Sequence, residues 1–321
     1  MKLKLLNPEL RRAYRFVPNT PVSSPFTRAL VRTGIGRMKP APTPAGVTFE
    51  KIDFDDAPSI HVFSPALGGN GAALLFIHGG GMVLGSPLMD YPLAIDVVRQ
   101  LGITVVLAGY RLAPEYPFPT PVDDCERGWN WIIDNASPRG IDTARVAIGG
   151  QSAGGGLAAM LTQRLHDKSG AQPAAQWLIC PMLDDRTAGD RSLDKIKNRL
   201  WNNKSNRAGW KAFLGTTPGS ADVPSGSVPS RRTDLSGLPP AWIGTGTVEL
   251  FYQEDVAYAH ALDAAGVDVT LDEVPGAPHA FEDMAAKTRI AQQYVERARR
   301  WLAGQLDVEY VERPVQSAGT K

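Results

Sequence analysis

The chain has 321 residues, 43% of them apolar and 21% charged, a composition typical of a globular protein and unlike that of a disordered one. With 34 Lys and Arg against 33 Asp and Glu, its net charge is +1, which argues against a nucleic-acid partner or recruitment by anionic lipid. We therefore expect a small-molecule substrate.

The first 46 residues divide into two parts. The segment MKLKLLNPELRRAYRF lacks the apolar core of a signal peptide and is predicted to form an amphipathic helix. Residues 18–46 are rich in Pro, Gly, Ser and Thr and are expected to be a connector, so residues 1–45 are assigned to N-terminal cap helices and connector. The sequence has no run of 18 apolar residues, and Cys125 and Cys180 have no paired spacing. We expect a cytoplasmic protein with no membrane span and no disulfide framework.

From there, short apolar runs alternate with helical stretches, which predicts an α/β protein with a mostly parallel, doubly wound sheet. Each run ends in Gly, Pro or a polar turn, as strands buried on both faces do. Residues 267–272 alternate apolar and polar side chains, which indicates a half-exposed edge strand. The other expected strands are 47–54, 60–63, 72–77, 105–108, 146–148, 177–180 and 241–243, and the expected helices are 121–135, 154–168, 255–265 and a final one over 290–302.

The alternation breaks at residues 184–214, a polar stretch that contains two tryptophans. We predict that this stretch is a helical insertion which, together with residues 1–45, caps the C-terminal edge of the sheet. The α/β core then comprises residues 46–183 and 215–306, and residues 307–321 form a C-terminal tail.

The strongest motif is Gly150-Gln151-Ser152-Ala153-Gly154, between a predicted strand and a predicted helix. A serine at so sharp a turn is pushed out above the sheet at a helix N-terminus, where backbone N–H groups face an incoming anion. Small neighbours are needed because the turn has little room, and Gly150 and Gly154 supply them. Ser152 is therefore predicted to be a nucleophile. The alternative is a glycine-rich turn that only packs a helix against the sheet. A phosphate loop is not favoured, because its Lys-Ser/Thr ending is missing.

A second motif, His78-Gly79-Gly80-Gly81, follows another predicted strand. Acyl transfer creates an oxyanion, and glycines let backbone N–H groups converge on it without obstruction by side chains. We expect the N–H groups of Gly80, Gly81 and Ala153 to bind this oxyanion. His78 is expected to hold the shape of its loop by hydrogen bonding rather than to act as a base.

The general base is expected to be His279, in the loop Pro275-Gly276-Ala277-Pro278-His279. It follows the serine and the candidate acids in the chain, the order Ser, acid, His. The remaining histidines have other predicted settings, a strand for His61 and helices for His166 and His260, where packing or surface roles are expected.

The acid has several candidates. Glu249 follows a predicted strand and lies 30 residues before His279, so its carboxylate can reach that loop. Asp184 follows the preceding strand and could equally be a turn residue. Glu254 and Asp255 stand where helix N-terminal capping is expected. We predict that Glu249 orients His279, with the other three as alternatives.

Together these motifs resemble the hormone-sensitive-lipase-like family of bacterial esterases, family IV of the α/β-hydrolase superfamily. The resemblance extends over roughly residues 60–282 and includes Tyr110-Arg111-Leu112-Ala113-Pro114-Glu115 and Cys180-Pro181-Met182-Leu183-Asp184-Asp185. It implies an α/β-hydrolase fold with a helical cap, hydrolysis without metal or cofactor, and a preference for short acyl chains. The chain departs from the family at two positions. The acid, commonly Asp, is Glu249, and the residue before the nucleophile, often Asp, is Gln151.

The resulting hypothesis is a carboxylesterase with a Ser152–His279–Glu249 catalytic triad that acts through an acyl-enzyme intermediate. Two other functions stay open, namely a non-catalytic small-molecule receptor on the same scaffold and an amidase or peptidase with the same triad. A receptor would be expected to lose a triad member, whereas here Ser152 and His279 are both present. The expected partner is a small ester, and the sequence leaves a homodimer open.

Overall fold

The computed structural model describes residues 2–20 and 22–312, and an eight-stranded sheet runs through it in the order β1-β2-β4-β3-β5-β6-β7-β8. β1 and β2 pair antiparallel, as do β2 and β4, whereas all the other neighbouring strands are parallel. The mostly parallel α/β sheet is therefore confirmed. The strands are β1 (Val47–Ile52), β2 (Ile60–Pro65), β3 (Ala73–Ile77), β4 (Thr104–Ala108), β5 (Val146–Gln151), β6 (Gln176–Ile179), β7 (Ala241–Gly246) and β8 (Val269–Val274).

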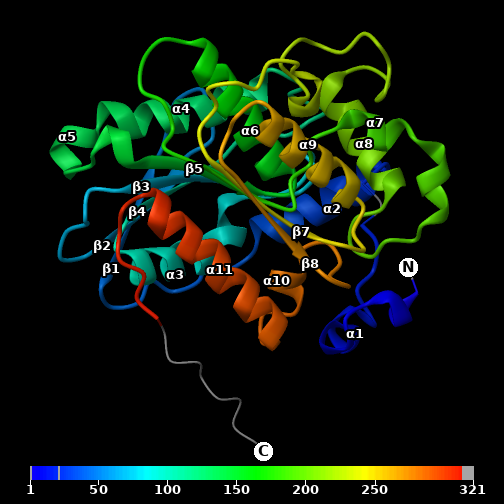
Figure 1. The fold of residues 1–321 in the computed structure, drawn as a ribbon, viewed down its shortest axis with the longest axis horizontal. Helices are drawn as coiled ribbons and strands as arrows, with labels where there is room; N and C mark the ends of the chain where they lie inside the picture. The colour runs from blue at the N-terminus through cyan, green and yellow to red at the C-terminus, as the bar shows by residue number, and fades with distance from the viewer. Residues whose placement is uncertain (1, 21, 313–321) are drawn as a thin grey trace, which may run out of the picture.

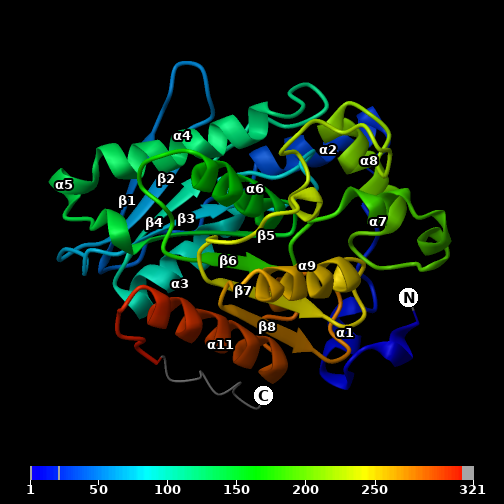
Figure 2. The same ribbon diagram turned by 45° about the horizontal axis from the view of Figure 1, so that its top comes forward.

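Helices cover both faces of the sheet (Figures 1 and 2). Alternate side chains of β3 show the two layers. Leu75 and Ile77 belong to one apolar core, and Leu74 and Phe76 belong to the other. A central strand must be apolar on both faces for this reason. Helices α4 (Thr120–Asp134), α6 (Ala153–Asp167) and α9 (Tyr252–Ala264) contribute to the first core, and α3 (Tyr91–Leu101) and α11 (Arg289–Gln305) to the second.

The N-terminal segment differs from the prediction in two ways. Residues 2–16 form two short 3₁₀ turns, η1 (Leu3–Leu5) and η2 (Pro8–Leu10), and a four-residue helix, α1 (Arg11–Tyr14), instead of one continuous amphipathic helix. Pro8 starts a new turn there, with Asn7 accepting a hydrogen bond from the Glu9 N–H. The expected connector contains α2 (Pro25–Gly36), a helix of 12 residues. Its start uses Ser24 as N-cap and Pro25 at the first position. Ser and Pro are as typical of helix starts as of connectors, so composition could not separate the two.

The insertion at residues 184–214 holds α7 (Asp185–Gly189), the turn η5 (Arg191–Lys195) and α8 (Asn203–Leu214). It is linked to the N-terminal segment by the β-bridge between Asn19 and Leu200 and by the Ser205 hydroxyl, which donates to the Thr20 carbonyl at 2.7 Å. Both segments lie at the end of the molecule to which the parallel strands point (Figure 2).

The remaining short elements are α5 (Ala136–Arg139), α10 (Phe281–Met284), η3 (Pro87–Asp90), η4 (Thr143–Arg145) and η6 (Pro229–Arg231). Of the expected C-terminal tail, residues 313–321 lie outside the described residues. The described part is anchored where the Val311 N–H donates to the Gln100 carbonyl at 2.8 Å. Among the described helices, none combines the length and hydropathy needed to span a bilayer.

Candidate active site

Ser152 occupies a sharp turn between β5 and α6, the strand–turn–helix setting that the sequence predicts. Its backbone angles, φ 56° and ψ −120°, lie outside the regions that L-residues ordinarily adopt. The Ser152 N–H donates to the Ile179 carbonyl at 2.8 Å, which fixes the turn against β6. A Cβ atom at Gly154 would lie 1.9 Å from the Ile77 carbonyl oxygen, so only glycine allows α6 to start this close to β3. The close approach holds the serine at the N-terminus of α6.

Three loops bring Ser152, His279 and Glu249 together. His279 Nε2 lies 2.9 Å from Ser152 Oγ, and His279 Nδ1 lies 2.6 Å from Glu249 Oε2. Because a carboxylate faces Nδ1, the ring proton belongs on Nδ1, and Nε2 is left to accept a proton from the serine hydroxyl. All three residues are buried, with 6–8% of their surface exposed, so water competes little for these bonds.

The other candidate acids bond elsewhere. Asp184 accepts from the Arg186 N–H at the start of α7 and forms an ion pair with the Arg186 side chain. Glu254 accepts from the Leu183 and Asp184 N–H groups, and Asp255 bonds to a buried threonine. The expectation that Glu254 and Asp255 cap α9 is therefore wrong. Both side chains turn back toward the ends of β6 and β7, and α9 begins with no side-chain cap.

The glycine loop after β3 faces the nucleophile. A Cβ atom at Gly79 would lie 3.4 Å from Ser152 Cβ, which places this loop against the serine. Gly80 and Gly81 have positive φ angles of 123° and 62°, which glycine adopts without strain. Ala153 is the first residue of α6, so its N–H has no acceptor within that helix. The glycine loop and the first turn of α6 therefore both adjoin Ser152.

His78 makes its contacts within its own loop. Its Nδ1 lies 2.9 Å from the Gly79 carbonyl oxygen, and its ring stacks on Tyr110 at 4.1 Å between centroids. Burial lowers the pKa of His78 to about 4, so the ring is neutral near pH 7. The arrangement suits a residue that shapes the loop better than one that acts as a base.

Two contacts at the site had no clear signal in the sequence. The Tyr14 hydroxyl donates to the His279 carbonyl at 2.6 Å, across 265 residues of chain. Tyr14 lies in a segment whose apolar pattern indicated only a helix face. Trp201, in the insertion, lies so close to Gly81 that a Cβ atom at that glycine would be 2.0 Å from its ring. The N-terminal segment, through Tyr14, therefore contacts the His279 loop, and the insertion, through Trp201, contacts the glycine loop.

Gln151, which precedes the nucleophile, links the serine turn to the segment after His279. Its Nε2 donates to Glu282 Oε1 and to Asp283 Oδ2, both at 2.6 Å. Burial, followed by the charge of Asp283, raises the pKa of Glu282 to about 8. An Asp at position 151, the residue that the family resemblance leads one to expect there, would face two carboxyl groups. The amide of Gln151 removes that repulsion and supplies two donors.

Cys180, Glu249 and His279 present possible metal-ligand atoms within 4.8 Å of one another. Glu249 and His279 already bond each other at 2.6 Å, and a metal would need its ligand atoms farther apart. Binding a metal here would break the contact that orients His279. The donor set therefore suits hydrogen bonding better than coordination.

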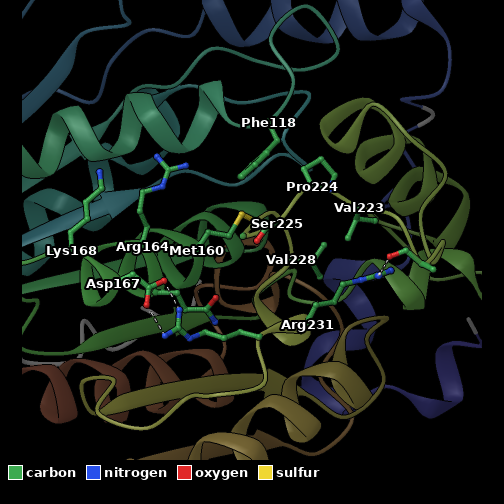
Figure 3. Close-up of a pocket in the computed structure, with 14 residues that line it drawn as sticks. Phe118, Met160, Arg164, Asp167, Lys168, Val223, Pro224, Ser225, Val228 and Arg231 are labelled. Carbon is green, nitrogen blue, oxygen red and sulfur yellow. Dashed lines mark hydrogen bonds and ion pairs between the residues drawn. The ribbon is translucent and has the colours of Figure 1, made fainter.

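A separate cavity of about 630 Å³ lies between α6 and the loop over residues 221–232 (Figure 3). Apolar side chains such as Met160 and Val228 line it, with Arg164, Lys168 and Arg231 among its charged groups. None of the three residues bonded through His279 lines this cavity. It does not contain the candidate active site.

Comparison with known proteins agrees with this fold. A family model described as the alpha/beta hydrolase fold matches residues 74–283. The chain is 34% identical over 223 residues to the ethyl acetate hydrolase of Pseudomonas putida. The aligned region covers 69% of this chain and 69% of that protein. The structure resembles a bacterial heroin esterase with a TM-score of 0.87 and 33% identity, covering 95% of this chain and 99% of that one.

A solved esterase from the bacterial hormone-sensitive lipase family matches with a TM-score of 0.76 and 27% identity, covering 94% of this chain and 99% of that chain. The resemblance predicted from the motifs is thus confirmed. The chain belongs to the α/β-hydrolase fold family, among its hormone-sensitive-lipase-like esterases, and is a carboxylic ester hydrolase.

Proposed function

We propose that the protein hydrolyses short- to medium-chain carboxylic esters with a Ser152–His279–Glu249 triad through an acyl-enzyme intermediate. The observation that carries this proposal is the continuous hydrogen-bond chain from Ser152 Oγ through both ring nitrogens of His279 to Glu249 Oε2. In this series of hydrogen bonds the serine hydroxyl faces a base, and the base faces a carboxylate, as nucleophilic acyl transfer requires.

In the first step, Ser152 Oγ attacks the ester carbonyl while His279 Nε2 takes the hydroxyl proton. The imidazolium that forms is stabilised by Glu249, which bonds to Nδ1. The N–H groups of Gly80, Gly81 and Ala153 bind the oxyanion of the tetrahedral intermediate. His279 then protonates the leaving alcohol, and the carbonyl re-forms as the acyl-enzyme. Water repeats the sequence with His279 as base and releases the acid.

The preference for short and medium acyl chains follows from the segments above the serine. We propose that residues 1–45 and 184–214 act as a cap, because Tyr14 and Trp201 bring them onto the catalytic loops. Ser152 is only 6% exposed beneath them, so an acyl group must fit a closed space. The similarity to an ethyl acetate hydrolase supports a small substrate.

Labelling and acyl specificity test the proposal. A fluorophosphonate probe should label Ser152 stoichiometrically, and p-nitrophenyl esters should give a burst of p-nitrophenol equal to the enzyme concentration when deacylation is slow. A panel of acyl chains should show the highest kcat/KM at about two to eight carbons, and matched amides should react far more slowly. Absence of labelling at Ser152 would refute the triad. Efficient turnover of emulsified long-chain triglyceride would refute the closed acyl space.

A further inference from the structure

The net charge of +1 hides a separation of charge between two parts of the molecule. Residues 1–45 and 184–214, here called the cap segments, contain 17 Lys and Arg against 5 Asp and Glu. The rest of the chain contains 17 Lys and Arg against 28 Asp and Glu. The cap segments are therefore strongly basic on an otherwise acidic protein, and the whole-chain count does not describe the surface of either part.

Many of the basic side chains in the cap segments point into solvent. Ion pairs in these segments engage only some of the arginines, such as Arg32 with Glu115 and Arg207 with Asp194. Nine other cations are exposed and form no ion pair with any carboxylate in residues 2–20 or 22–312. They are Lys2, Lys4, Arg12, Arg15, Arg37, Lys39, Lys195, Lys204 and Lys211.

Exposed apolar side chains gather in the same segments. Of the 12 large apolar residues that are exposed in the described structure, six belong to the cap segments, namely Leu5, Phe16, Phe26, Leu30, Met38 and Ile196. Phe26 and Leu30 lie one turn apart on α2 and are 77% and 62% exposed. On the same helix, Arg32 turns inward and donates to the Val83 carbonyl at 2.8 Å. The outward face of α2 is therefore apolar.

Apolar and basic groups are thus exposed together at one end of the molecule. Figure 2 shows α1, α2, α7 and α8 at the end toward which the parallel strands point. Ser152 follows the last residue of β5 and so lies at this end. Adjacent exposed apolar side chains such as Phe26 and Leu30 mark an interaction surface more often than isolated ones do. Peripheral membrane proteins combine apolar insertion with Lys and Arg that bind anionic headgroups.

We propose that the outer surface of the cap segments binds the interface of an anionic lipid membrane. Phe26 and Leu30 insert at the boundary between headgroups and acyl chains, and the exposed lysines and arginines pair with lipid phosphates. A soluble anion would use the charges but would leave Phe26 and Leu30 in water. A lipid interface uses both features at once, and its negative potential is opposite in sign to that of the cap segments. Binding of this kind needs no membrane-spanning helix.

Vesicle sedimentation tests the proposal, with the Ser152→Ala protein so that binding is read without turnover. The protein should sediment with vesicles of phosphatidylcholine and phosphatidylglycerol, at about three to one, and not with phosphatidylcholine alone. Raising NaCl from about 0.05 to about 0.5 M should release it, because screening shortens the range of the attraction. Failure to sediment with the anionic vesicles would overturn the proposal and leave the triad untouched.

Paired variants localise the surface. Lys204→Glu with Lys211→Glu should weaken vesicle binding by at least about tenfold, since each cation near an anionic surface contributes about fivefold. The control is Lys51→Glu with Lys287→Glu, which changes the net charge equally at exposed sites outside the cap segments and should bind nearly as the parent does. Leu30→Ser should weaken binding several-fold, whereas Leu67→Ser, at a residue that is fully exposed outside the cap segments, should not.

Three outcomes would contradict a lipid partner. If Lys204→Glu with Lys211→Glu and the control Lys51→Glu with Lys287→Glu lose vesicle binding equally, binding depends only on net charge. A raised KM for a soluble anionic ester in Lys204→Glu with Lys211→Glu, with vesicle binding unchanged, would assign the charge to substrate attraction. If Leu30→Ser converts a dimer to a monomer in sedimentation velocity without affecting vesicle binding, a second copy of the chain covers this surface.

Discussion

The hydroxyl of Thr245 lies 2.6 Å from Asp255 Oδ2, and its other neighbour is the carboxylate of Glu249, whose Oε1 is 2.9 Å away. A hydroxyl has one proton and can donate to only one of these oxygens. The second contact is a hydrogen bond only if a carboxyl group keeps its own proton. Burial, followed by the charge of Glu249, raises the pKa of Asp255 well above 3.8, which favours Asp255 as the carboxyl group that holds this proton. Asp255 then donates to Thr245, and Thr245 donates to Glu249.

Asp255→Asn should retain nearly full activity, because the amide can donate to Thr245 as the neutral carboxyl does. We expect kcat within about threefold of the parent, and a loss of about tenfold for Asp255→Ala, which leaves Thr245 without its donor. Steady-state turnover of p-nitrophenyl butyrate measures both. Equal losses in the two variants would mean that the charge of Asp255, rather than its hydrogen bond, matters.

The free energy of unfolding of Asp255→Asn should depend less on pH than that of the parent protein. Asp255 loses its proton in the unfolded chain above about pH 4, whereas the raised pKa in the folded protein retains the proton to higher pH, so the contribution of this group to stability falls as pH rises through the range above 3.8. Asp255→Asn removes that fall. Urea unfolding at about pH 5 and about pH 8 should show a smaller difference in the free energy of unfolding for Asp255→Asn than for the parent. Asp263→Asn, on an exposed position of the same helix, should behave as the parent does.

Ser152→Ala should abolish ester hydrolysis and leave the fold intact, because alanine fits wherever serine does in the tight turn. We expect kcat to fall by at least about 10³-fold, and His279→Ala combined with Ser152→Ala to be no worse than either alone, since the residues act as a unit. Turnover and near-ultraviolet circular dichroism check both points. Unchanged turnover in Ser152→Ala would refute the assignment of Ser152 as the nucleophile of the triad.

Glu249→Gln should lower kcat by about 10²–10³-fold, since an amide favours the wrong tautomer of His279. Glu249→Asp keeps the charge one methylene farther away and should be milder. Asp184→Asn should affect stability more than rate, because Asp184 bonds to Arg186 at the start of α7. A large loss of kcat in Asp184→Asn, with kcat close to that of the parent in Glu249→Gln, would show that the catalytic acid is Asp184, which follows β6, and not Glu249.

Tyr14→Phe tests the contact between the N-terminal segment and the His279 loop. Loss of the hydroxyl leaves the buried His279 carbonyl without its donor, at a cost of about 1–3 kcal/mol, and should lower kcat by up to about tenfold as the loop shifts. Tyr258→Phe is the matched control. It removes a buried hydrogen bond to Gln163, on α6 away from the site, and should reduce stability alone. Equal kcat in the two variants would assign Tyr14 a purely structural role.

Chelation should not change the rate. The proposed steps use a serine, a base and backbone donors, so EDTA should leave kcat at its starting value. Excess Zn²⁺ should inhibit, because its binding by Cys180, Glu249 and His279 would break the contact between the last two. Loss of activity in EDTA, recovered on addition of zinc, would contradict this account.

The sequence by itself predicted the local chemistry of the site. The setting of Ser152 is readable because a strand, a tight turn flanked by glycines and a helix are consecutive in the chain. The glycine loop at His78–Gly81 and the chain order of Ser152, Glu249 and His279 are likewise local or linear properties. The apolar runs predicted the parallel sheet because a strand covered on both faces needs apolar side chains throughout.

Only the tertiary structure could decide which distant groups meet. Glu249, Glu254 and Asp255 lie within seven residues of one another, and the direction in which each side chain leaves the end of β7 or the start of α9 determines that Glu249 alone reaches His279. The contact between Tyr14 and His279 joins residues 265 apart, and no periodicity encodes such a pair. The turns at residues 2–16 and the helix α2 also depended on context, because marginal helical segments form or break according to what they pack against.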